Sequence, residues 1–183
     1  MAAMAPQSGL HLRADPARFR SKWSGRTLTL NAITEDVVAY LTKSAVSRRI
    51  DAIVAEELQK GPCVVVAHSL GSIVAYRTLR ALGPRAQCKQ LITVGSPLGL
   101  QAVREMLVPR PLQHPDNVDA WFNAYDPRDV VSLRPLDAST WDIKPHIENF
   151  AGVENHIENC HNINGYLDNA VVARRIFEAL NAR

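Results

Sequence analysis

Residues 63–76 read CVVVAHSLGSIVAY, the pattern of a buried strand that turns directly into a helix. The apolar run CVVV follows Gly61 and Pro62, and an unbroken apolar run of this kind is typical of a parallel strand covered on both faces. Beyond the turn, apolar residues recur at helical spacing until Gly83 and Pro84 end the helix. These apolar residues are Ile73, Tyr76, Leu79 and Leu82.

Ser69 lies at the corner between the two elements, in the pattern Ala67-x-Ser69-x-Gly71. A serine held in a strained backbone conformation needs small residues two positions before and after it, because these pack closely around the turn. Ala67 and Gly71 meet that demand. The turn directs the serine oxygen off the carboxyl edge of the sheet, beside the free amide groups of a helix N-terminus. Ser69 is therefore predicted to be a nucleophile.

At these residues the chain resembles the α/β-hydrolase family, and within it the lipases and esterases, in which Ala-His-Ser-x-Gly is a familiar nucleophile elbow. The resemblance covers roughly residue 34 to the C-terminus, about the second half of the family's sheet. It implies a shortened form of that α/β fold, a mostly parallel sheet with helices on both faces. It also implies a serine ester hydrolase that forms an acyl-enzyme on small-molecule carboxylic esters of small or medium acyl chain, without a cofactor.

A serine hydroxyl becomes a good nucleophile when a neighbouring base takes its proton and a buried carboxylate orients that base. The resemblance implies the chain order serine, acid, histidine. The turn YDPRDVV at residues 125–131 follows a predicted strand and supplies two carboxylates. We expect Asp129, which precedes two valines, to be the acid. Asp126 is the alternative, although an aspartate before proline is also common in turns.

The expected base is His161, which lies in a polar loop after the last predicted strand and before the last helix. His156 is its nearest competitor. The remaining histidines have less support, because they precede this strand, lack a supporting context or, inside the elbow, point off the line of reaction. They are His11, His68, His114 and His146.

One oxyanion donor is predicted, the main-chain amide of Leu70. The family's second donor comes from a His-Gly type turn in the first half of its sheet, and this chain contains no such turn. Another N-terminal amide or a partner chain would have to replace it, or the protein is a feeble or inactive relative. The second hypothesis for function is therefore a non-catalytic or weakly active binding or assembly module. Leu98, Leu100, Met106 and Val130 are predicted to line an acyl pocket, or to be ordinary core.

Strands alternate with helices along the rest of the chain, which predicts βαβ units and an α/β fold. A short edge strand is predicted at 27–30, and helices are predicted from Thr34 and across residues 46–58. Further strands are expected at 90–94, 118–125 and 147–150, a helix at 100–108, and a last helix from about Asn169. A shortened sheet exposes an edge strand, so we expect a homo-oligomer formed through that edge.

The 183 residues suit one domain, and a composition of 46% hydrophobic and 21% charged residues is that of an ordinary globular protein. A net charge of +3 is too small to indicate nucleic-acid binding. No apolar run reaches the roughly 20 residues that cross a bilayer, and no signal peptide is predicted at the start of the sequence. No zinc spacing or Cys-x-x-Cys pair is found. The three cysteines favour a cytoplasmic protein. Residues 1–33 are predicted to be a basic, partly ordered segment, and 34–183 to be the α/β-hydrolase-like domain.

Overall fold

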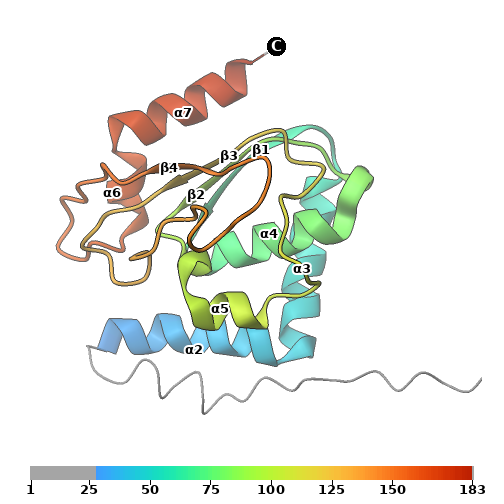
Figure 1. Ribbon diagram of the computed structural model, residues 1–183, viewed down its shortest axis with the longest axis horizontal. Coiled ribbons are helices and arrows are strands. Elements are labelled where there is room, and N and C mark those ends of the chain that lie inside the picture. The colour runs from blue at the N-terminus through green and yellow to red at the C-terminus, as the bar shows by residue number, and fades with distance from the viewer. Residues whose placement is uncertain (1–27, 183) are drawn as a thin grey trace, which may run out of the picture.

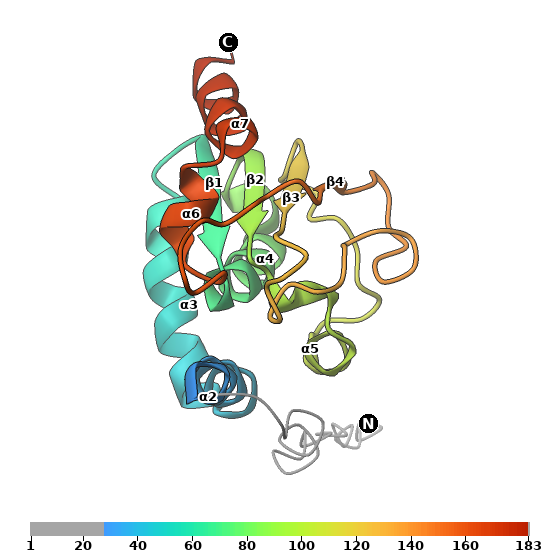
Figure 2. The ribbon, with the colours of Figure 1, turned by 90° about the vertical axis from the view of Figure 1, so that its left-hand side faces the viewer.

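Four parallel strands form one sheet in the computed structural model, which describes residues 28–182 (Figure 1). They lie side by side in chain order, with β1 at one end and β4 at the other (Figure 2). The prediction of an α/β protein with a parallel sheet is confirmed. The strands are β1 (Cys63–His68), β2 (Cys88–Val94), β3 (Trp121–Ala124) and β4 (Glu148–Phe150).

Helices cover both faces of this sheet. α4 lies against one face and α7 against the other, while α2, α3 and α5 extend the α4 side (Figure 1). The helices are α2 (Leu28–Thr42), α3 (Ser44–Leu58), α4 (Leu70–Leu82), α5 (Gln101–Met106), α6 (Ile163–Leu167) and α7 (Ala170–Asn181). Short 3₁₀ turns follow α4 and β2, at η1 (Gly83–Arg85) and η2 (Pro97–Gly99).

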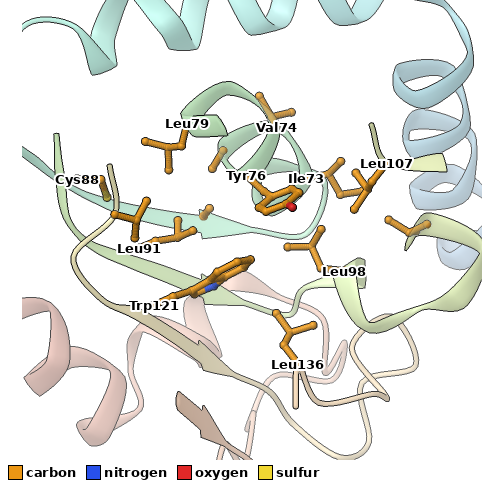
Figure 3. Close-up of a cluster of buried hydrophobic side chains, with 14 of the residues drawn as sticks. Ile73, Val74, Tyr76, Leu79, Cys88, Leu91, Leu98, Leu107, Trp121 and Leu136 are labelled. Atoms are coloured by element: carbon orange, nitrogen blue, oxygen red, sulfur yellow. The ribbon is translucent and has the colours of Figure 1, made fainter. Parts of the chain in front are cut away.

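The alternation of side chains along each strand divides the core into two clusters. On the α4 face, Leu91 and Trp121 pack with Ile73, Tyr76 and other helix residues (Figure 3). On the α7 face, a smaller cluster is built on β2, β3, α6, α7 and the segment after β4, and comprises Ile92, Val94, Phe122, Ala124, Val153, Tyr166 and Val172. The elbow helix α4 is buried on most of its sides, including residues 72–76, and this packing against the sheet holds the start of the helix in place.

Two buried polar side chains in the middle of the sheet are hydrogen-bonded to each other. Thr93 donates its hydroxyl to Asn123 Oδ1 at 2.9 Å and accepts from Trp121 Nε1 at 3.0 Å. Asn123 Nδ2 donates in turn to Asn149 on β4 at 3.0 Å. Because buried polar groups are costly unless they are paired, this chain of bonds links β2, β3 and β4 in one register.

The N-terminal predictions need correction. Residues 28–30 belong to α2, so the predicted edge strand is wrong over them, and the helix expected from Thr34 begins six residues earlier, at Leu28. A four-residue alternation is too short to separate a strand from one turn of helix, and no helix-breaking residue lies between it and Thr34. Thr27 and most of the predicted basic segment lie outside the described residues. β3 and β4 are also shorter than predicted, and α5 ends at Met106.

β1 is an edge strand, since β2 is its one partner among residues 28–182. The Cys63 amide donates to the carbonyl of Gln87, just before β2, and the Ser69 amide donates to the carbonyl of Val94, the last residue of β2. Main-chain groups alternate along a strand, so those of Val64, Val66 and His68 face the free edge. Val66 is 37% exposed there. Separately, no helix among the described residues is long and apolar enough to cross a membrane.

Candidate active site

Ser69 lies in a strained backbone conformation between β1 and α4. Its φ of 52° and ψ of −125° make it the one non-glycine residue with positive φ in the described part of the chain. Its carbonyl accepts from the Ser72 hydroxyl at 2.6 Å, and Ser72 bonds Ser96 at 2.7 Å. Both of these serines are buried, so the strained turn is held by a short polar chain that the sequence analysis did not find.

Of the two small residues around Ser69, Ala67 is closely packed and Gly71 is not. Ala67 is buried against the α4 side of the core, as the elbow pattern predicts. A Cβ added to Gly71, however, would have no neighbour within 4 Å, so the expected close packing at Gly71 is wrong within the described residues. The space beside Gly71 is open because no described segment packs against that side of the turn.

Gly95, after β2, is the glycine that the site requires. Its φ is 55°, and an added Cβ would lie 3.1 Å from Tyr166 Cε2 and 3.2 Å from the His68 ring. We expect Gly95→Ala to lower the free energy of unfolding by about 1–3 kcal/mol, because it adds both backbone strain and a close contact. Urea unfolding would measure this. Gly71→Ala is the matched control, and an equal loss in both variants would contradict the assignment.

Ser69, His161 and Asp129 form one hydrogen-bonded chain. His161 Nε2 lies 2.8 Å from Ser69 Oγ, and His161 Nδ1 lies 2.8 Å from Asp129 Oδ2. A carboxylate only accepts, so Nδ1–H donates to Asp129 and the bare Nε2 accepts the serine proton. The loops after β3 and β4 bring these residues to the carboxyl edge of the sheet, where β1 places Ser69.

The carboxylate of Asp129 is buried and fully hydrogen-bonded. Besides His161, Oδ2 accepts the Tyr166 hydroxyl at 2.6 Å, and Oδ1 accepts the Val131 amide at 2.9 Å. Burial raises the pKa of Asp129, but these donors outweigh it and hold the pKa below its usual range. Burial and the nearby Asp129 charge raise the pKa of Tyr166, so it remains a protonated donor.

Asp126, the alternative acid, faces a different set of groups. It accepts from the Arg128 guanidinium at 2.7 and 3.1 Å, and from the amides of Arg128 and Asn155, both at 2.8 Å. Burial raises the pKa of Asp126, and these donors lower it below its usual range. No described contact joins Asp126 to His161 directly. Asp126 instead holds Asn155, which is itself bonded to the His161 loop.

The other described histidines lie away from Ser69 Oγ or face elsewhere. His156 is exposed and lies 3.7 Å from Asp168, while exposed His146 contacts Lys144. His114 is buried against Pro115 and Trp121. His68 packs against the His161 ring, and its Nε2 faces the His161 carbonyl rather than Ser69 Oγ. His11 lies outside the described residues.

The α4 N-terminus offers one anion donor. Leu70 is the first residue of α4, where a helix amide has no intrahelical acceptor. Within residues 28–182, the Leu70 amide is therefore the candidate donor for a negatively charged oxygen at Ser69. The predicted acyl-pocket residues Leu98, Leu100 and Met106 belong to the core on the α4 side. A groove of about 540 Å³ lies elsewhere, between α5 and residues 140–143, and is lined by none of the three hydrogen-bonded residues.

Sequence reasoning missed the residues that support the hydrogen-bonded chain. No motif or spacing in the sequence singles out Tyr166 or Asn155 for a role at the site. Asn155 Nδ2 donates to the carbonyls of Cys160 and Asn162, at 2.9 and 2.8 Å. A Cβ on Gly165 would overlap the Asn155 side chain. A glycine at position 165 is therefore required by Asn155, but the sequence does not show that the two residues are in contact.

Neither protein-family models, curated proteins nor solved structures give a match to this chain. Among the described residues, no group of three or more His, Cys, Asp or Glu side chains is placed to hold a metal ion. The hydrogen bonds that join Ser69, His161 and Asp129 define what this site can do chemically. It can move a proton from a hydroxyl to an imidazole that a buried carboxylate supports.

Proposed function

We propose that this chain is a serine ester hydrolase of the α/β-hydrolase type, with Ser69 as nucleophile, His161 as base and Asp129 as the orienting acid. The observation that carries the proposal is the continuous chain of 2.8 Å hydrogen bonds from Asp129 through His161 to Ser69. The strained Ser69 backbone supports it, since such strain persists only where the surrounding structure holds it.

The proposed reaction has two halves. His161 Nε2 accepts the Ser69 proton as Oγ attacks the ester carbonyl, and the Leu70 amide stabilises the oxyanion. His161 then returns the proton to the leaving alcohol, which leaves an acyl group on Ser69. Water, activated by His161 in the same way, releases the acid. Asp129 keeps Nδ1 protonated throughout and stabilises the imidazolium.

The second candidate function, a weakly active or non-catalytic module, is favoured by a specific observation. One oxyanion donor is identified in residues 28–182, and loss of one donor costs about 10² to 10³ in rate. The open space beside Gly71 lies next to that donor. A scaffold of this kind would have no activated serine.

A fluorophosphonate distinguishes the two functions, because it phosphonylates only activated serines. We expect the intact mass of the wild type to gain one adduct and that of Ser69→Ala to gain none. Peptide mapping should place the adduct on Ser69. A folded wild type without an adduct would contradict the esterase proposal for this chain alone.

We also propose that the free edge of β1 pairs with a second copy of the chain. β1 reads CVVVAH and carries no Lys, Arg, Asp or Glu, the charged side chains that usually protect an edge strand. Light scattering is expected to give twice the 20.2 kDa mass of one chain. Val66→Lys should halve the measured mass by placing a charge on that edge. A wild-type mass of one chain at high dilution would contradict self-pairing.

A further inference from the structure

We propose that His68 is a positioning residue, which fixes the main chain of His161 relative to Ser69 by donating Nε2–H to the His161 carbonyl. The His68 Nε2 to His161 O distance is 2.8 Å. This inference rests on the proposed function of the site. It assigns a role to a histidine that the sequence predicts to point away from the reaction.

His68 gives a short path between two groups that are distant in sequence. Ser69 and His161 are separated by 92 positions, so their approach depends on how the His161 loop packs against the turn between β1 and α4. His68 is the immediate neighbour of Ser69 and bonds the backbone of His161 itself. The two imidazole rings also pack together, with centroids 4.6 Å apart and planes tilted by 37°. Ser69 and the His161 main chain are therefore connected through the peptide bond between His68 and Ser69 and the hydrogen bond from His68 to the His161 carbonyl.

The main-chain groups around the His161 carbonyl have hydrogen-bond partners within the same segment, whereas the His161 carbonyl is bound by His68. Asn155 Nδ2 binds the carbonyls on either side, those of Cys160 and Asn162, and Asn159 Oδ1 accepts the His161 amide at 3.1 Å. Among the described residues, His68 is the one donor to the carbonyl between them. Loss of His68 therefore removes a restraint that no neighbour replaces.

The surroundings of His68 suit a neutral ring with a single N–H. Burial, followed by repulsion from His161, lowers the pKa of His68 below its usual range. A neutral ring whose Nε2 donates has a bare Nδ1. It also places no second positive charge beside His161 when that residue takes up the serine proton. Gly95 lacks the side chain that would crowd this ring.

Two amide variants that differ by one methylene test the proposal. Gln places an amide Nε2 near the position of the histidine Nε2, whereas Asn falls short of the carbonyl. We expect His68→Asn to lower kcat for a p-nitrophenyl ester by about 10- to 100-fold, with KM within about twofold, because small misplacements of catalytic groups have effects of this size. His68→Gln should recover most of that loss. His156→Gln is the control for an exposed histidine and should match the wild type.

Proton NMR gives a readout that does not need turnover. The His161 Nδ1–H that bonds Asp129 is expected as a far-downfield resonance in the wild type and His68→Gln, and to broaden or disappear in His68→Asn. Equal kcat in all three proteins, or equal losses in the Gln and Asn variants, would overturn the proposal. A wild type that takes up no fluorophosphonate and hydrolyses no ester would refute the proposed function instead, and the resonance would still report whether His68 positions His161.

Discussion

Replacement of His161 by alanine is expected to lower kcat for ester hydrolysis by about 10⁶-fold, the size of effect seen when the base of a serine triad is removed. His161 is the one described side chain that forms a hydrogen bond with Ser69 Oγ, at 2.8 Å. Without it no positioned group accepts the serine proton, and a serine hydroxyl is a weak nucleophile. Steady-state turnover of a p-nitrophenyl ester and the rate of fluorophosphonate adduct formation would both measure the loss.

His156→Ala is the matched control for this variant. His156 lies in the same segment between β4 and α6, but it is exposed and pairs with Asp168 rather than with Ser69. Its turnover should equal that of the wild type. If His161→Ala kept one tenth of the wild-type kcat while remaining folded, or if His156→Ala lost activity instead, the assignment of the base would be wrong.

Asp129→Asn is expected to lower kcat by about 10⁴-fold without unfolding the protein. The asparagine keeps the shape of the carboxylate, but its amide can donate to Nδ1, which favours the tautomer with the proton on Nε2. That tautomer cannot accept from Ser69. The pH dependence of the variant is informative, because the low pKa of Asp129 keeps the wild-type carboxylate ionised well below neutral pH. The loss should therefore be present across the whole range from pH 5 to 8.

Asp126→Asn separates the two candidate acids. Asp126 binds Arg128 and the Asn155 amide, so its replacement should lower the free energy of unfolding while kcat stays within about tenfold of the wild type. Chemical denaturation and steady-state kinetics on both variants would give the comparison. A larger loss of kcat in Asp126→Asn than in Asp129→Asn would reverse the assignment.

The sequence was enough to predict the order of the four strands and of the longer helices from Ser44 onward, whereas the short helix α6 lies in a segment predicted to be a polar loop. Short apolar runs bounded by turn residues, such as VVV in β1 and LITV in β2, predict buried strands. Glycine and proline mark the ends of the helices, at Gly83 and beyond Leu58. The same reasoning failed at residues 28–30, because the alternating pattern of residues 27–30 fits both a strand and one turn of a helix. A local pattern identifies a helix or a strand when it is long and ends at turn residues, and it does not when it covers only a few residues.

Residue type and chain order also selected Ser69, Asp129 and His161, which the structure brings together. The sequence favoured Asp129 but left Asp126 open, because both carboxylates lie in one turn and the packing of the His161 loop determines which of them faces Nδ1. Tyr166, Asn155 and His68 were found only in three dimensions. Their roles depend on hydrogen bonds between residues far apart in sequence, and neither periodicity nor spacing records such contacts.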